Sequence, residues 1–364
     1  MRNHFACFIA AHRPDQMRRI ERRLGASAEY PCFFSCFFRL LCSRDDRCGN
    51  ISGVHAKVLA ALEETELVAC ADIVRERAEG MAASYGCRAY ADYEEMLEAE
   101  RLDAVHLCTP HGLHPAMALA AAKRGIAVFT EKPPAIDRKG WEMIREAAGL
   151  VPVGICFQNR YHGNVIRMQE LAASGDFGAL RGIRAFVTWC RTADYYPAGG
   201  WKGTWATEGG GALINQAVHT LDLVLRFLGA PDQVEAHLAN HHLRGVIEVE
   251  DTAEIYLRSG DKTALLYAST AYSADAPVII ELDLEGAVLR LEGDGLEIRR
   301  GGKAESVDCG GDIALGKSYW GVGHKACISD FYASIREGRP FANDPASCEV
   351  TMETLLSVYE RRKI

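Results

Sequence analysis

The feature that most constrains the fold of this chain is a regular alternation of short apolar runs and helical patterns, which begins at Gly53. Apolar runs predict strands at residues 66–71, 104–108 and 126–130, and helical patterns lie around them at 54–63, 74–85, 93–99 and 114–124. Because these strands are almost continuously apolar, we expect both of their faces to be buried. The alternation therefore predicts an α/β domain whose parallel sheet is covered by helices on both sides.

The pattern changes after about residue 135. A helix at 139–148 and a strand at 152–156 complete the first layer, and β-branched runs follow at 183–189, 233–240, 252–258, 263–271, 278–284 and 287–292. The stretch 212–228 reads as one amphipathic helix, and 323–338 and 347–361 are helical again. Strands with few crossover helices between them predict an α+β domain with a large, mainly antiparallel, open sheet. We expect the C-terminal helices to pack back on the first domain.

The 364-residue chain is long enough for two domains, which we place at residues 47–135 and 136–364. Its 48% hydrophobic and 25% charged residues are typical of a folded globular protein. The net charge of −8 argues against nucleic acid as a partner. No apolar run reaches the roughly 18 residues that a membrane-spanning helix needs. We therefore expect a small-molecule ligand, with neither nucleic acid nor a membrane as partner.

The 13 cysteines form no recognisable metal or disulfide pattern. No CxxC pair occurs, and Cys32 and Cys36 have no second pair or histidine at ligand spacing. His241 and His242 are adjacent on a predicted strand, so their side chains should point to opposite faces and not share an ion. The sequence thus predicts no metal site and a reducing, cytoplasmic location.

Residues 1–46 form an atypical N-terminal segment. A buried strand is expected directly before the first helix, but residues 39–46 (RLLCSRDD) place charged side chains there. With one choice of codons for residues 43–47, a shift by one base reads Val-Gly-Met-Ile-Gly, which restores a strand and a glycine. One hypothesis is therefore that this segment is a frameshift product that replaced the first strand.

A glycine loop opens the first helix. Gly49 and Gly53 match two positions of the G-x-G-x-x-G dinucleotide fingerprint with one extra residue between them, whereas Arg47 occupies the first position. The backbone of Gly49, Asn50, Ile51 and Gly53 would face a pyrophosphate at the helix N-terminus. Asp72 follows the next strand at the spacing of the acid that binds a ribose 2′-hydroxyl, which favours NAD over NADP. These features predict a Rossmann-type domain that binds NAD, with NADP as the alternative.

Two further strands end in polar motifs at the edge where such sheets bind ligands. The strand at 126–130 runs into Glu131-Lys132-Pro133-Pro134, a stiff turn that a cis peptide bond would suit. The strand at 104–108 runs into Thr109-Pro110, and His111 and His114 are expected to cap the next helix. Thr109, Pro110, His114, Glu131 and Lys132 are predicted cofactor contacts.

The third motif lies in the second domain. Glu208 and three glycines precede a helix on which Asn215 and His219 stand four residues apart, so both should reach one substrate. Histidine is the side chain best suited to exchange a proton near neutral pH. Asp222 lies one turn further on, where it would orient the imidazole or serve as an ordinary buried acceptor.

Together, the glycine loop with Asp72, CTPHGLH, EKP and GGGALINQAVHTLDL resemble the Gfo/Idh/MocA family, which includes glucose–fructose oxidoreductase and inositol dehydrogenase. The resemblance covers roughly residues 48–360. It implies hydride transfer between NAD(P) and a secondary hydroxyl of a sugar, cyclitol or polyol, with a homodimer or homotetramer as the assembly. It places Lys132 and His219 at the reacting hydroxyl, and Asn215 where many members carry an aspartate.

The resemblance implies that His219 takes the hydroxyl proton and that Lys132 stabilises the developing alkoxide. Asn215 cannot titrate and would only orient the substrate. The predicted substrate contacts are Arg160, Tyr161, Trp201, Lys202 and His324. Two alternatives stay open: an NAD-dependent glycosidase of the same fold, which would accumulate no NADH, and a non-catalytic homologue whose first strand is impaired.

Overall fold

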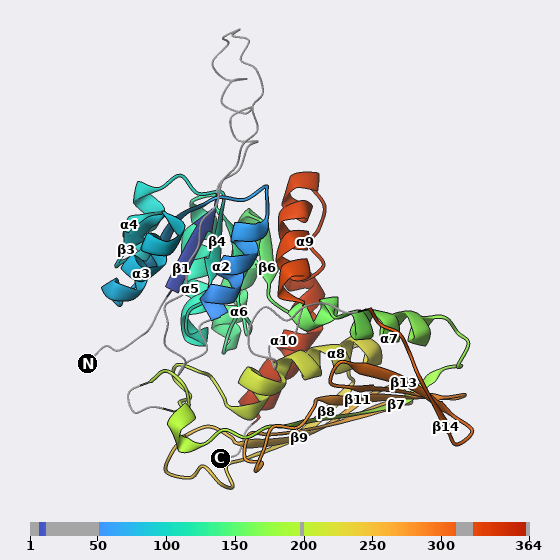
Figure 1. The fold of residues 1–364 in the computed structure, drawn as a ribbon. Coiled ribbons are helices and arrows are strands. Elements are labelled where there is room, and N and C mark those ends of the chain that lie inside the picture. The colour runs from blue at the N-terminus through green and yellow to red at the C-terminus, as the bar shows by residue number, and fades with distance from the viewer. Residues whose placement is uncertain (1–6, 12–50, 197–199, 311–322, 362–364) are drawn as a thin grey trace.

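The computed structural model describes residues 7–11, 51–196, 200–310 and 323–361, which form two sheets with helices packed on them (Figure 1). The first sheet has six strands in the order β3-β2-β1-β4-β5-β6. Its strands are β1 (Cys7–Ala11), β2 (Leu67–Asp72), β3 (Arg88–Tyr90), β4 (Ala104–Leu107), β5 (Ala127–Thr130) and β6 (Val153–Ile155). Its helices are α2 (Ile51–Ala61), α3 (Arg75–Tyr85), α4 (Tyr93–Ala99), α5 (His114–Lys123) and α6 (Arg138–Leu150).

The α/β fold predicted for this half is confirmed. Val105, Val128 and Phe129 are completely buried, as expected for strands that are covered on both faces. Helix α3 ends at Gly86, whose φ of 69° lies in the left-handed region that glycine adopts without a steric penalty. The short strand β3 was not predicted, because its three residues show no apolar run.

The centre of this sheet differs from the expected arrangement. Strand β1 comes from the atypical N-terminal segment and pairs antiparallel with both β2 and β4, whereas the other pairs of the sheet are parallel. Ala11 pairs with Ala104, the first residue of β4, so the chain leaves β1 at the amino edge of the parallel strands. The central strand is therefore present but does not lead directly into α2. Residues 12–50, with Cys32, Cys36, Gly49 and Asn50, lie outside the described residues.

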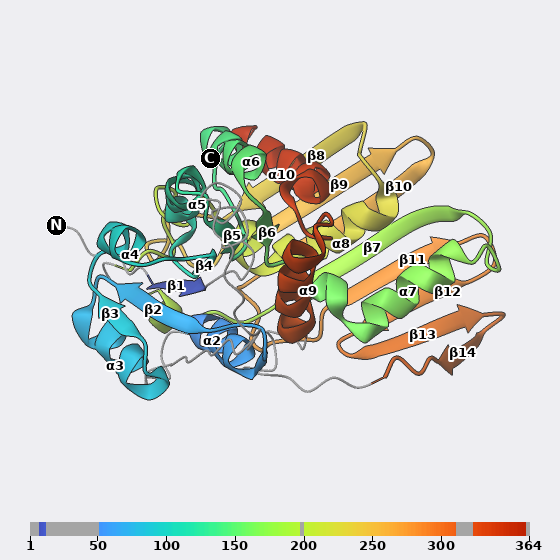
Figure 2. The ribbon, with the colours of Figure 1, turned by 90° about the horizontal axis from the view of Figure 1, so that it is seen from above.

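The second sheet has eight strands in the order β14-β13-β12-β11-β7-β10-β9-β8. The strands are β7 (Leu180–Thr188), β8 (Gln233–Ala239), β9 (Thr252–Ser259), β10 (Lys262–Ser269), β11 (Ile279–Leu284), β12 (Val288–Glu292), β13 (Gly295–Arg300) and β14 (Lys303–Ser306). Only β7 and β10 pair in parallel among these strands, so the predicted mainly antiparallel sheet is confirmed. Helix α7 (Gly163–Ala173), which was not predicted, lies over this sheet together with α8 (Val218–Leu228) (Figure 2).

The helix predicted at 212–228 is divided in two. Residues Ala212–Ala217 form a π-helical segment, η4, and α8 continues from it. Gly211 precedes η4 at a point where a Cβ atom would lie 2.0 Å from the carbonyl oxygen of Glu250. Wide π turns occur often at functional sites. Here the glycine lets the start of η4 approach the backbone of the neighbouring segment.

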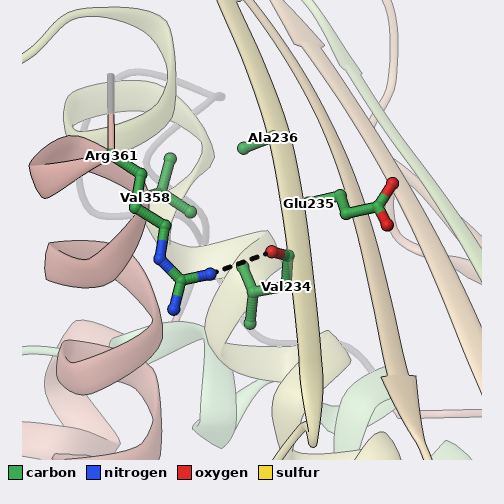
Figure 3. Close-up of a pocket in the computed structure, with 5 residues that line it drawn as sticks. All are labelled: Val234, Glu235, Ala236, Val358 and Arg361. Carbon is green, nitrogen blue, oxygen red and sulfur yellow. Dashed lines mark hydrogen bonds between the residues drawn. The ribbon is translucent and has the colours of Figure 1, made fainter. Parts of the chain in front are cut away.

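The last two helices pack against the first sheet and its helices, and α10 also contacts β8 of the second sheet. Helix α9 (His324–Glu337) packs on α2, and its Ile328 and Phe331 share a buried cluster with Leu59 and Phe129 of the first sheet and its helix. Helix α10 (Pro345–Glu360) is followed by Arg361, whose Nη1 donates a hydrogen bond to the carbonyl oxygen of Val234 at the wall of a small pocket (Figure 3). None of the predicted site residues lines that pocket.

No helix in the described part of the chain is long and apolar enough to cross a membrane. His241 and His242 lie in the turn after β8 rather than on a strand, and their backbone N–H groups donate to the Asp251 carboxylate. The eight cysteines whose side chains the structure describes are all thiols.

Candidate active site

The turn after β5 brings Lys132 to the start of η4. The peptide bond between Lys132 and Pro133 is cis, as the two consecutive prolines suggested. The Nζ of Lys132 donates a hydrogen bond of 2.7 Å to the backbone carbonyl oxygen of Asn215. Lys132, Asn215 and His219 are each half-buried, although their direct neighbours in η4 and α8 are mostly buried. The three residues that the sequence singled out therefore belong to one place in the fold.

Burial and charge determine the proton states of these side chains. Burial lowers the pKa of the Lys132 ammonium, and the Glu131 carboxylate partly offsets this effect. Burial, followed by the positive charge of Lys132, lowers the pKa of His219 well below its usual range. His219 is therefore a neutral imidazole with a lone pair available as a base. Its buried Nδ1 has no partner among the described residues, and its Nε2 lies 3.4 Å from Nε2 of Gln158.

The structure decides between the two roles that the sequence left open for Asp222, and it gives Arg160 partners other than the predicted one. Asp222 does not orient the His219 imidazole, because its carboxylate forms a buried ion pair with Arg160 at 2.6 and 2.7 Å and accepts from Thr351 as well. Arg160 was predicted to contact the substrate, but its guanidinium is fully engaged by this pair and by groups near α10. The hydroxyl of Tyr161 donates to Asp330 at 2.7 Å.

Glu131 anchors a chain of buried hydrogen bonds that the sequence did not reveal. Its Oε1 lies 2.8 Å from Nε2 of His55, whose Nδ1 lies 2.9 Å from Nδ1 of His106. The Nε2 of His106 lies 3.0 Å from the Tyr332 hydroxyl. Burial pushes the pKa of Glu131 up, but the hydrogen bond from His55 and the nearby positive charges outweigh this and hold it below its usual range. Since the ionised carboxylate only accepts, Nε2 of His55 donates the hydrogen bond to Glu131.

His324 and Cys156 lie next to this chain. The potential ligand atoms of His55, Glu131, Cys156 and His324 are within 4.8 Å of one another, although sequence spacing gave no metal site. The 2.8 Å contact between His55 and Glu131 is a hydrogen bond, because two ligands of one tetrahedral zinc ion lie about 3.3 Å apart. Burial lowers the pKa of His324 to about 3, so its ring is neutral. His324, predicted as a substrate contact, thus lies in this buried group.

The loop after β4 connects the first sheet to the second domain. His111 and His114 do not cap α5, because each ring faces backbone carbonyl oxygens instead. The nitrogens of His114 lie 2.8 Å from the carbonyl oxygens of Pro133 and Thr109, so this ring holds the turn after β5 against the loop after β4. The Nδ1 of His111 donates to the carbonyl oxygen of Glu208 at 2.9 Å.

Asp72 ends β2 at the same edge of the sheet. Its Oδ1 accepts a hydrogen bond of 2.8 Å from the backbone N–H of Val74, and burial raises its pKa to about 6. Ile51 begins α2 and is half-buried, whereas Gly53 and the following turn are buried. Pro110 is buried beside Thr109, whose Oγ1 is a buried polar atom without a partner among the described residues.

Trp201 and Lys202 lie on the loop before the three glycines, and both are half-buried. The Nζ of Lys202 lies 3.7 Å from the ring centroid of Tyr195, and the indole of Trp201 packs edge-on against the His111 ring at 4.7 Å. This loop therefore contacts the loop after β4. The cationic and aromatic groups there would suit a substrate rich in hydroxyl groups.

The sequence indicates Glu208 only as the residue that precedes three glycines. In the structure it is 1% exposed and accepts hydrogen bonds from the Asn215 side chain and from the Gly203 backbone. The one sequence feature that could have indicated its role is the position of a charged residue between an aromatic loop and a glycine run. A charged residue that is buried there needs partners, because buried charges are rare without them.

The described residues fit a nicotinamide dinucleotide. Asp72, Thr109, Glu131 and Lys132 stand at the carboxyl ends of β2, β4 and β5, where ligands bind in open α/β sheets. The buried Oγ1 of Thr109 and the buried Nδ1 of His219 have no partner among the described residues, so each can serve a polar ligand. The N-terminus of α2 lies near the same edge, since His55 in its second turn bonds Glu131.

Comparison with known proteins gives matches over both halves of the chain. Residues 48–150 match the model of the oxidoreductase family with an NAD-binding Rossmann fold, and residues 165–289 match the GFO/IDH/MocA C-terminal domain. The chain is 31% identical to D-glucoside 3-dehydrogenase of Escherichia coli over 50% of its length and 53% of that protein. It is 28% identical to an inositol 2-dehydrogenase of Rubrobacter xylanophilus over 54% of its length and 53% of that protein.

The match thus spans about half the length of each of these two relatives. Among solved structures, the chain resembles the WlbA dehydrogenase of Bordetella pertussis in complex with NADH and UDP-GlcNAcA, with a TM-score of 0.74 and 25% identity. That likeness covers 86% of this chain and 93% of the other.

Proposed function

We propose that this chain, which belongs to the GFO/IDH/MocA family of NAD-binding oxidoreductases, oxidises a secondary hydroxyl of a sugar, cyclitol or related polyol. The observation that carries the proposal is the 2.7 Å contact between Lys132 and the backbone of Asn215. This contact joins the turn after β5 to the segment that carries His219. The Lys132 ammonium and the neutral His219 imidazole therefore lie at the same site. The relatives named as glucoside and inositol dehydrogenases support this substrate class.

In the proposed mechanism, the substrate hydroxyl lies between Lys132 and His219. The neutral imidazole of His219 accepts the hydroxyl proton. The Lys132 ammonium donates a hydrogen bond to the oxygen as negative charge develops on it, and its lowered pKa makes it a stronger donor. Asn215 orients the substrate, and Trp201 and Lys202 contact its other hydroxyl groups.

NAD+, when bound, supplies the hydride acceptor. Asp72 would hold its ribose hydroxyls, which favours NAD over NADP because a 2′-phosphate would be repelled. Thr109, Pro110 and Lys132 would line the nicotinamide side, and the N-terminus of α2 would face the pyrophosphate. Glu131 and His114 hold the loops that form this edge.

The test begins with the full-length protein, titrated with NAD+ and NADH by fluorescence and then screened with sugars, cyclitols and polyols for NADH formation. We expect micromolar cofactor binding and net NADH with at least one compound. Lys132→Met should lower kcat/KM by roughly 10²- to 10⁴-fold, whereas Lys139→Met, which changes an exposed lysine of α6, should leave it unchanged. Substrate cleavage without net NADH would favour the glycosidase alternative.

The antiparallel β1 favours one rival function, a homologue that no longer binds its cofactor. The chain leaves β1 at the edge opposite to Asp72, so a short loop from β1 cannot deliver the pyrophosphate site. Absence of NAD+ binding in the titration would support this rival and contradict the proposed activity.

We also propose a homodimer or homotetramer that forms through the second sheet. Helices α7 and α8 cover one face of this sheet, and Leu265 of β10 is 48% exposed. Light scattering of the purified protein tests the assembly. The thiol state of the described cysteines supports a cytoplasmic location, which fractionation of the source cells would test.

A further inference from the structure

A buried carboxylate that the proposed mechanism does not use lies behind Asn215. Oε1 of Glu208 accepts a hydrogen bond of 2.5 Å from Nδ2 of Asn215, and its Oε2 accepts one of 2.5 Å from the backbone N–H of Gly203. The carbonyl oxygen of Glu208 accepts from His111 at 2.9 Å. Glu208 therefore connects η4, the loop that contains Trp201 and Lys202, and the loop after β4 of the first domain.

These contacts fix the orientation of the Asn215 amide. An ionised carboxylate only accepts hydrogen bonds, so the amide must turn its NH₂ group toward Glu208. The Oδ1 atom of Asn215 is then on the side of the amide that faces away from Glu208. Because Lys132 holds the backbone of the same residue at 2.7 Å, Asn215 is fixed at both its main chain and its side chain.

We propose that Glu208 is a positioning residue of this site: it orients the Asn215 amide so that Oδ1 accepts a hydrogen bond from a substrate hydroxyl, and it holds the 201–205 loop against the same segment. The proposal rests on the function proposed above. It adds a rule of specificity, because an acceptor at this point selects a substrate that carries a hydroxyl donor next to the reacting carbon. A carbonyl or carboxylate there would face Oδ1 without a hydrogen.

The surroundings of Glu208 make this orientation dependent on pH. Burial raises the pKa of Glu208 to about 7, and the hydrogen bonds from Gly203 and Asn215 only partly oppose this. The titratable or charged groups that face it are Lys132, Lys202, Glu250, Tyr196, Tyr359 and His111. Once protonated, the carboxyl group can donate to Asn215, so the amide is free to turn over.

The kinetic test compares Glu208→Gln with Glu250→Gln. Glu250 is a matched control, because it is also 1% exposed, its pKa is also raised by burial, and it bonds Leu213 and Tyr359 rather than Asn215. The profile of kcat/KM against pH should show an acidic limb near pH 7 in the wild type. Glu250→Gln should keep this limb but move it to lower pH, because the charge of Glu250 helps to raise the pKa of Glu208. Glu208→Gln should lose this limb and lower the plateau by about tenfold to hundredfold.

A second measurement needs neither substrate nor cofactor. Trp201 and Trp205, two of the five tryptophans, stand on the loop that Glu208 contacts, so the tryptophan fluorescence of the cofactor-free protein includes a signal from this loop. The fluorescence of the wild type should change with pH with a midpoint near pH 7. Glu208→Gln should abolish this transition, whereas Glu250→Gln should keep it with a lower midpoint, because the charge of Glu250 helps to raise the pKa of Glu208. Asn215→Asp should move the midpoint upward, since a second carboxylate would lie against the first. This variant also serves if Glu208→Gln does not fold.

The outcomes separate the two proposals. If the wild type oxidises none of the compounds screened, the proposed function is wrong, and the fluorescence titration alone then tests the positioning role of Glu208. A limb and a titration that both persist in Glu208→Gln would overturn the positioning role. A similar decrease of activity in both glutamine variants, with the shape of the pH profile unchanged, would mean that Glu208 has only a structural role. This result would overturn the positioning role as well.

Discussion

The ion pair between Arg160 and Asp222 should be a principal support of the region where the chain leaves the first sheet and packs against α8. Its side chains are 4% and 1% exposed, and it joins the segment after β6 to α8. Asp222→Asn keeps the shape of the side chain but removes its charge. The amide keeps one acceptor oxygen, but its NH₂ group faces the second N–H arm of the guanidinium, which can only donate, and the buried cation loses its counter-charge. Breaking such a pair from one side typically costs about 3–5 kcal/mol of unfolding free energy.

Urea unfolding at neutral pH measures this cost, and Glu170→Gln is the matched control. Glu170 pairs with Arg167 at 2.8 Å, but the two side chains are 56% and 44% exposed. Solvent screens such a pair, so its loss should cost no more than about 0.5 kcal/mol. The double variant Arg160→Met/Asp222→Leu should regain most of the loss, because apolar side chains leave no buried charge.

The result that would refute this reasoning is an Asp222→Asn protein within about 1 kcal/mol of the wild type. Such a result would mean that water or neighbouring carbonyl groups compensate Arg160, whose Nη1 already donates to Ala342 and Asn343. A double variant no more stable than Asp222→Asn would contradict the account from the other direction.

Three further predictions follow from single positions. Gly211→Ala should destabilise the protein and impair the site, since its Cβ would lie 2.0 Å from the Glu250 carbonyl oxygen. Gly149→Ala, whose Cβ would have no atom within 4 Å, should raise the free energy of unfolding by about 0.5–1 kcal/mol. Thermal unfolding of both variants tests these two expectations. Asp72→Ser should reduce the preference for NAD+ over NADP+, measured as the ratio of the two affinities. The same ratio in the variant and in the wild type would contradict the assignment of Asp72 to the ribose. Because burial raises the pKa of Glu208 from 4.5 to about 7, its stabilisation is complete below pH 4.5 and is lost as pH rises to about 7. Relative to Glu208→Gln, the wild type should therefore lose about 3 kcal/mol across that range, and parallel stability curves of the two proteins would disprove it.

The elements of this fold were largely predictable from the sequence, because their signals are local. The helix Tyr93–Ala99 has the bounds that its pattern predicted, and Gly86 ends α3. Neither the position nor the direction of β1 was predicted from the sequence. An apolar run indicates that a strand is buried, but both parallel and antiparallel neighbours can pair with its backbone N–H and C=O groups.

The site was predictable only as far as its motifs lie beside one another in the chain. Lys132 and His219 were found because each stands in a short motif next to a strand or a glycine run. The partners of Asp222 and the role of Glu208 depend on contacts between distant segments. Arg160 and Asp222 are 62 positions apart, and no periodicity links them.

Because α9 packs on α2, the first domain can complete its buried core only after α9 has been synthesised. Phe331 and Phe341 complete the cluster around Phe129, yet they follow it in the chain by about two hundred residues. A ribosome that adds about 5–20 residues per second releases them roughly 10–40 s after the strand they cover. Throughout that interval, the face of the nascent sheet that α9 will cover is open to chaperones and to other nascent chains. The domain that is synthesised first is thus completed last, and a premature stop near the 3′ end of the message would damage the nucleotide-binding half.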